Sequence, residues 1–240
     1  MKICIIGNSH VAALKLAWEN HFDKRCKIDN DITFFASRGK SLRSLKLENN
    51  KLIPNSEHLK KNLRATSGGK SFIELASYDV FLLYGLATQP YYEHGLFYSK
   101  ALMDDWLAEY RAASLPIKIL EMMPAGLCKK IYIGHNPMPS EILEPEANLV
   151  DCKSDAYELG LSFINKTVFN LYAAELLPQP PSTIAASGRN TIFEYNKGSR
   201  RLDVGDKRSN RLHPTRDRLH MNDKFGKIWL EEFFKYIRKG

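Results

Sequence analysis

A serine hydroxyl stands near the start of the chain, in the run Gly7-Asn8-Ser9-His10. Residues 3–6 before this run are apolar and mostly β-branched, which is typical of a strand buried on both faces of a parallel sheet. The pattern predicts a turn that places Ser9 at the carboxyl end of the strand and at the start of a helix. Open α/β sheets bind ligands at this edge, and the N–H groups of a helix start stabilise developing negative charge. Ser9 is therefore a candidate nucleophile, with the alternative that Ser9 or Asn8 only caps the helix.

A second reactive pair stands near the other end of the chain, where Asp217 and His220 precede an amphipathic segment at residues 224–238. A Gly-Asn-Ser run near the N-terminus, with Asp-x-x-His before the last helix, resembles the SGNH (GDSL-type) serine hydrolase family. The resemblance implies that Ser9 is the nucleophile, that His220 is its base and that Asp217 holds the imidazole. This division of roles agrees with the general logic of a triad, because a serine hydroxyl needs a base to remove its proton.

The resemblance also implies an oxyanion hole built from the backbone N–H groups of Ser9 and Gly39, the latter after the second predicted strand. The family's Gly-x-Asn block lacks its asparagine here, because Gly85 is followed by Leu-Ala-Thr-Gln. Asn136 follows another predicted strand end and offers a substitute amide. The third donor stays open among three residues: Thr88, Gln89 and Asn136.

The side chains beside these blocks are candidate substrate contacts, namely Asn8, His10, Arg38, His135, Arg216 and Arg218. His135 has the alternative of a structural loop histidine. The formal net charge of +8 is concentrated between Lys197 and Arg218. We expect an anionic ligand, such as a phosphate-bearing acyl donor or an acidic glycan, with Arg211 as a further contact. The alternative is a solvated loop, and without a recognised motif the charge does not indicate nucleic acid as a partner.

The size and composition of the chain predict one globular domain over residues 1–240. Apolar residues make up 44% and charged residues 26% of the 240 positions, which is ordinary for a globular protein. No apolar stretch approaches the ~20 residues of a membrane span or the ~7–15 of a signal-peptide core, so we expect a cytoplasmic protein. The cysteines and histidines lack zinc-ligand spacing, and we expect no metal and no cofactor.

Alternating strand and helix patterns predict an α/β fold, a three-layer sandwich with a mostly parallel central sheet. By resemblance this is the flavodoxin-like fold of SGNH hydrolases. The predicted strands are residues 3–6, 31–36, 51–54, 80–84, 116–122, 131–133 and 191–195. The predicted helices are residues 11–22, 72–76, 99–113, 151–177 (as one helix or two) and 224–238. Tyr91 and Tyr92, after the strand at 80–84, either stack on a sugar or pack internally.

Together these observations predict a serine esterase or O-acyltransferase that acts on an O-acyl ester through a Ser-His-Asp triad. The resemblance extends to proteins of surface-polysaccharide biosynthesis, so a carbohydrate ester is one expected substrate. Hydrolysis and acyl transfer use the same machinery and stay open. The alternative from a different class is a catalytically silent glycan- or ligand-binding module on the same fold.

Overall fold

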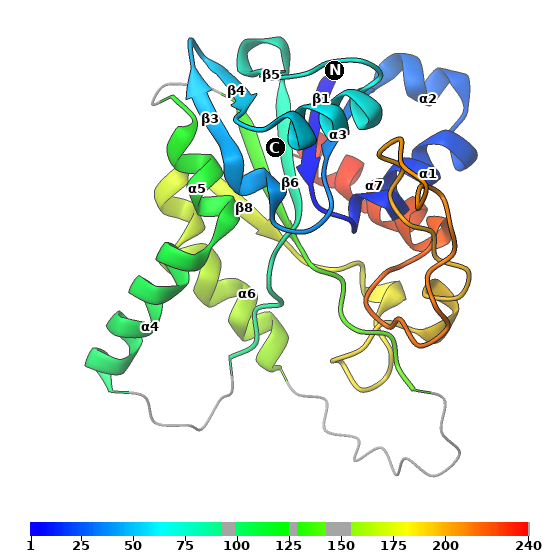
Figure 1. Ribbon diagram of the computed structural model, residues 1–240. Coiled ribbons are helices and arrows are strands. Elements are labelled where there is room, and N and C mark those ends of the chain that lie inside the picture. Colours follow the sequence, from blue (N-terminus) through cyan, green and yellow to red (C-terminus); the bar gives the residue numbers. More distant parts are fainter. Residues whose placement is uncertain (93–98, 125–128, 143–154, 240) are drawn as a thin grey trace.

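The computed structural model describes residues 1–92, 99–124, 129–142 and 155–239. Within these ranges, a central sheet of five strands has the order β2-β1-β6-β7-β8, and every neighbouring pair is parallel (Figure 1). Its strands are β1 (Lys2–Gly7), β2 (Asp31–Ala36), β6 (Val80–Ala87), β7 (Lys130–His135) and β8 (Ala174–Leu177). The predicted α/β class with a mostly parallel central sheet is therefore confirmed.

The remaining elements are helices and a small antiparallel sheet. The helices are α1 (Val11–His21), α2 (Lys24–Asp29), α3 (Glu57–Ser67), α4 (Lys100–Ala113), α5 (Leu115–Met122), α6 (Ala156–Thr167) and α7 (Asp223–Lys239). The small sheet joins β3 (Leu45–Glu48), β4 (Lys51–Pro54) and β5 (Ile73–Glu74). Short 3₁₀ turns occupy Ser41–Ser44, Leu75–Ser77, Phe169–Tyr172, Pro181–Thr183 and Phe193–Tyr195.

The central sheet is buried on both faces because successive side chains of a strand point to opposite sides. In β1, Ile3 and Ile5 belong to one apolar cluster with side chains of α1 and α7. Cys4 and Ile6 belong to the opposite cluster with side chains of α3, α5 and α6 (Figure 1). The result is the expected helix–sheet–helix arrangement in three layers.

Helices α1 and α7 pack tightly against each other although they lie at opposite ends of the sequence. A Cβ atom at Gly226 of α7 would come 2.1 Å from the carbonyl oxygen of Ala13 in α1, so only glycine permits this approach. The contact brings the segment before α7 next to the segment before α1. The two end blocks of the sequence therefore meet at one place.

Two segments differ from the sequence prediction in the type of element. Residues 116–122, predicted as a strand, lie in helix α5; Pro116 stands in its first helical turn, where its missing N–H costs nothing, and residues 115, 116, 117, 119 and 120 are buried. The helix predicted over residues 151–177 ends at Thr167, and its last part is strand β8; residues 151–154 lie outside the described ranges. The side chain of Asn165 accepts a hydrogen bond from Leu176 N at 2.7 Å, which fixes the turn back into the sheet.

Two shorter predictions are also wrong. Residues 72–76, predicted as a helix, contain the two-residue strand β5 and the start of a 3₁₀ turn. Residues 191–195, predicted as a strand, make only isolated bridges through Thr191 and then a 3₁₀ turn. In the part of the chain that the structure describes, no helix is both long and apolar enough to cross a membrane.

Candidate active site

Ser9 lies in the turn between the carboxyl end of β1 and the start of α1. Residue Gly7 at the end of β1 pairs with Ala36 of β2 and Tyr84 of β6, so the loops after these three strands share one edge of the sheet. Among the described residues, α1 has no side-chain cap at its first turn, and the Oγ of Ser9 is instead 2.9 Å from Nε2 of His220. The side chain therefore does not cap the helix.

Asp217 completes a continuous chain of hydrogen bonds with Ser9 and His220. Its carboxylate oxygens lie 2.9 and 3.1 Å from Nδ1 of His220, which assigns the proton to that ring nitrogen and leaves Nε2 to face Ser9. Oδ1 also accepts the backbone N–H of Leu219 and of His220. Partial burial raises the pKa of Asp217, but these N–H groups and the nearby imidazole outweigh it and hold the pKa below its ordinary value.

The loop that carries Asp217 and His220 is fixed by asparagine side chains. Nδ2 of Asn196 donates to the carbonyl oxygens of Asp217 and His220 at 2.9 and 2.7 Å. Asn222, directly before α7, accepts the N–H of Phe225 through Oδ1 and so caps that helix. The triad is thus held by backbone anchors on both sides of His220.

A further histidine, His213, shares the carboxylate of Asp217. Its Nδ1 lies 2.9 Å from Oδ2 of Asp217, and its ring stacks on His220 with centroids 3.9 Å apart and planes at 12°. His10 stacks on His220 as well, with centroids 4.9 Å apart and planes at 25°. Burial lowers the pKa of His213 to about 4 and that of His10 to about 3, so both rings are neutral at pH 7.

His213 was not among the site residues predicted from the sequence. It stands four residues before Asp217, but outside a helix that spacing does not imply contact. In the described residues, the cluster His213, Asp217 and His220 is also the group whose donor atoms lie close enough to hold a metal ion. Because the two Nδ1 atoms already face the carboxylate, a metal would have to replace these hydrogen bonds.

Asn8, a predicted substrate contact, instead joins the ends of two strands. Its Nδ2 donates a short hydrogen bond to the carbonyl oxygen of Gly85, and its Oδ1 accepts the N–H of His10 at 2.9 Å. Gly85 has φ of +70°, and a Cβ atom there would lie 2.7 Å from Oδ1 of Asn8. Both the positive φ and the lack of space for a Cβ atom require glycine at position 85, and the turn that carries Ser9 depends on this glycine.

Three of the predicted oxyanion donors, Gly39, Thr88 and Asn136, line a pocket of about 260 Å³, and Asn8, next to Ser9 in the sequence, lines it as well. Gly39 follows β2 with φ of +66°. Within the described chain, the N–H groups of Ser9 and Gly39 have no hydrogen-bond acceptor. Backbone donors without an acceptor are what an oxyanion would require.

The three candidates for the last donor are in different situations. Nε2 of Gln89 donates to the carbonyl oxygens of Asn136 and Pro137 at 3.1 and 2.6 Å, which uses its N–H bonds. Thr88 is exposed at the pocket rim. Asn136 lines the same pocket as Gly39, and no hydrogen bond within the described residues occupies its Nδ2, the group that could donate to an oxyanion, or its buried Oδ1. Asn136 is therefore the best-placed amide.

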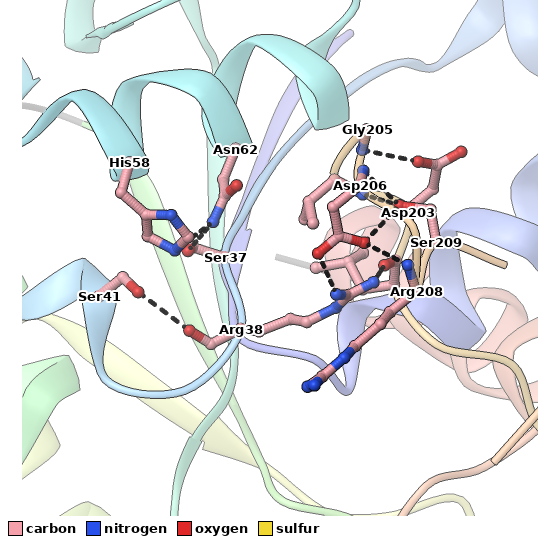
Figure 2. A network of polar contacts seen from close by, with 12 residues as sticks. Ser37, Arg38, Ser41, His58, Asn62, Asp203, Gly205, Asp206, Arg208 and Ser209 are labelled. Atoms are coloured by element: carbon pink, nitrogen blue, oxygen red, sulfur yellow. Dashed lines mark hydrogen bonds and ion pairs between the residues drawn. The ribbon is translucent and has the colours of Figure 1, made fainter. Parts of the chain in front are cut away.

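Arg38 is engaged away from the pocket. Its guanidinium forms an ion pair with Asp206 at 2.7 Å and donates to the carbonyl oxygen of Leu202, so it ties the end of β2 to the basic segment at residues 197–218 (Figure 2). Figure 2 also shows the Oγ of Ser41 donating to the backbone oxygen of Arg38 at 3.0 Å. This predicted substrate contact has a structural role.

The other predicted substrate contacts divide into bound and free side chains. His135 is buried, with Nε2 at 2.6 Å from the Tyr157 hydroxyl and Nδ1 at 2.5 Å from a backbone oxygen; burial lowers its pKa to about 4. This geometry corresponds to the structural alternative for His135. Arg218 donates through Nε to the Ser140 carbonyl oxygen at 2.7 Å. Arg216 is exposed and makes no side-chain contact with the described residues.

Neither the family models nor the curated proteins searched contain a match to this chain. The function must therefore be argued from the geometry of the site itself.

Proposed function

We propose that the protein is an SGNH-type serine hydrolase or O-acyltransferase that acts on O-acyl esters. The observation that carries the proposal is the unbroken chain of hydrogen bonds from Ser9 through His220 to Asp217, together with two backbone N–H groups, of Ser9 and Gly39, that have no acceptor among the described residues. Each group has a position that suits one step of acyl transfer.

In this mechanism, Oγ of Ser9 attacks the carbonyl carbon of the ester while Nε2 of His220 takes the hydroxyl proton. The negative charge on the carbonyl oxygen is stabilised by the N–H groups of Ser9 and Gly39 and by the amide of Asn136. His220 then gives its proton to the leaving alkoxide, which departs as an alcohol and leaves an acyl-serine. Water or a second alcohol, deprotonated by His220, attacks this intermediate and restores the free serine.

The neutral rings of His10 and His213 lie against His220, which becomes positively charged when it takes the proton of Ser9. Both rings stack on His220 and are uncharged, so neither opposes the positive charge that His220 gains in the transition state. The ionised carboxylate of Asp217 stabilises the same charge from the edge of the ring.

A fluorophosphonate probe tests the proposal because it reacts with activated serines. We expect the wild-type chain to be labelled and to hydrolyse p-nitrophenyl acetate, and Ser9→Ala to do neither while unfolding at the same urea concentration. His220→Ala provides a second inactive variant that retains the serine. A folded wild-type protein that resists labelling and leaves the ester intact would favour the silent binding module instead.

The molecule that takes the acyl group from Ser9, water or a second alcohol, decides whether the reaction is hydrolysis or transfer. A carbohydrate O-acyl ester is the substrate class that the resemblance suggests, and acetylated oligosaccharides are the appropriate test compounds. Release of free acetate indicates hydrolysis, whereas a rise in acetylated product when a second sugar is added indicates transfer. Both outcomes require Ser9.

A further inference from the structure

An apolar pocket of about 240 Å³ lies beside the candidate active site, between the segment after β6 and helices α4 and α6. Its walls include Met103 and Trp106 of α4 and Phe163 of α6. Thr88 and Tyr110 line both this pocket and the pocket that contains Gly39 and Asn136. The apolar pocket therefore adjoins the site where the ester carbonyl would bind.

The segment after β6 is anchored so that this pocket is a fixed part of the fold. The backbone N–H of Tyr92 donates to the carbonyl oxygen of Ala156 at the start of α6, at 2.8 Å. Gln89 holds the same segment to the end of β7 through the carbonyl oxygens of Asn136 and Pro137. These anchors fix one wall relative to both the sheet edge and α6.

The chemistry of the lining suits a hydrocarbon better than a sugar. Sugar recognition needs several converging hydrogen-bonding groups, but the amide N–H bonds of Gln89 and the hydroxyl of Tyr91 are already directed at backbone carbonyl oxygens. The rings also stack on each other, Tyr92 on Phe163 and Trp106 on Tyr110, with centroids 5.3 and 5.2 Å apart. Apart from the hydroxyl of Thr88 and the polar ends of Tyr92, Trp106 and Tyr110, the lining offers a ligand aliphatic and aromatic surface.

We propose that this pocket binds the hydrocarbon chain of the acyl group whose carbonyl carbon Ser9 attacks. The inference rests on the proposed function and names its substrate class, an ester with an acyl chain several carbons longer than acetyl. Each methylene group that enters the pocket in the transition state raises kcat/KM by about fourfold, from the free energy of burying one methylene. The gain ends when the chain fills the pocket.

A series of p-nitrophenyl esters from acetate to decanoate tests this with the full chain. We expect kcat/KM to rise steadily to hexanoate or octanoate and then to level off. Met103→Trp, which fills the pocket, should lower the ratio of octanoate to acetate hydrolysis at least tenfold. The control Leu171→Trp changes a residue that is 67% exposed and outside the pocket, and should leave that ratio at the wild-type value.

Binding without chemistry separates this inference from the proposed function. In Ser9→Ala, methyl octanoate should shift the emission of the half-exposed Trp106 to shorter wavelength, whereas methyl acetate should not. Trp106→Phe in the same background should remove the signal. A saturable shift in a protein that hydrolyses no ester would support the pocket and reject the enzyme. Acetate hydrolysis with no gain from longer chains and no shift would overturn the pocket while leaving the enzyme intact.

Discussion

The rings of His213 and His220 lie nearly parallel, 3.9 Å apart, and both direct Nδ1 at the same oxygen of Asp217, each at 2.9 Å. With its pKa lowered to about 4 by burial, His213 is neutral at pH 7 and donates from Nδ1. The carboxylate therefore accepts from two imidazoles and is fixed in one orientation, while the uncharged ring covers one face of the base.

We predict that His213→Ala lowers kcat about 10- to 100-fold with little change in KM, because one hydrogen bond to a charged group is lost. His213→Asn, which retains a donor, should recover part of kcat. A loss of activity that only follows a loss of stability, without recovery in His213→Asn, would contradict this role.

Buried neutral histidines predict a loss of stability in mild acid. Burial lowers the pKa of His10 to about 3 and of His135 to about 4, compared with about 6.5 in the unfolded chain. Between these values the unfolded state binds more protons, so the free energy of unfolding falls as pH decreases from about 6.5 toward 4, by up to about 1.4 kcal/mol per pH unit for each histidine.

Urea unfolding at pH 7, 6 and 5 measures this dependence. His135→Gln should make the slope shallower, whereas Leu171→Gln, at a position 67% exposed and without a titratable group, should leave it unchanged. If the two variants show the same slope as the wild type, His135 is not a neutral buried base in the folded state.

The hydrogen bond from Asn8 to Gly85 predicts that Asn8→Asp, which hardly changes the size of the side chain, alters the stability in a way that depends on pH. Asn8→Asp replaces the donor to the Gly85 carbonyl oxygen with a carboxylate oxygen, so it should destabilise the fold by about 1–3 kcal/mol at pH 8. Below the pKa of the new side chain the protonated carboxyl group can donate again, and the difference from wild type should shrink. A variant with unchanged stability and activity at pH 8 would show that the donor is dispensable.

Asn136→Ala is expected to lower kcat by about 10²–10³, the usual effect of removing one oxyanion donor, with stability largely retained because its side chain has no partner in the described residues. Thr88→Val is the matched control at the same pocket. The reverse pattern, with a large loss for Thr88→Val and none for Asn136→Ala, would move the third donor to Thr88.

The exposed Arg216 predicts a preference for anionic esters that depends on salt. Charges at the surface act over about 8 Å at physiological ionic strength, so the preference should weaken as salt is added. Arg216→Ala should lower kcat/KM for an anionic ester but not for a neutral one. Lys207→Ala, also exposed and in the same segment, is the control. Equal efficiency for both esters at low salt would leave the segment as a solvated loop.

Several strands could be predicted from the composition of the sequence, and so could the three residues Ser9, Asp217 and His220, but not His213 beside them. The strand predicted over residues 31–36 has the same bounds as β2, because this short run is rich in β-branched and aromatic residues. The structure brings Ser9, Asp217 and His220 within hydrogen-bonding distance, as the resemblance of the two end blocks led us to expect.

The parts that could not be predicted depend on contacts between distant residues. Strand β8 has only four residues, and its pairing with β7 and its contact to Asn165 decide its conformation. The apolar pattern of residues 116–122 predicted a strand. These residues form helix α5 instead, because Pro116 fits the first helical turn and the apolar side chains are buried against the sheet. Arg38 was predicted near the ligand because of its place after β2, and only the structure reveals its pairing with Asp206.

The close packing of α1 on α7 has a consequence for the order in which the protein becomes competent during synthesis. Ser9 is synthesised 211 residues before His220, and helix α7, which packs on α1, follows His220 in the sequence. In a nascent chain, the hydroxyl of Ser9 therefore has no imidazole beside it until α7 has docked on α1. In the proposed mechanism, the serine therefore gains its base only after the contact between α1 and α7 has formed.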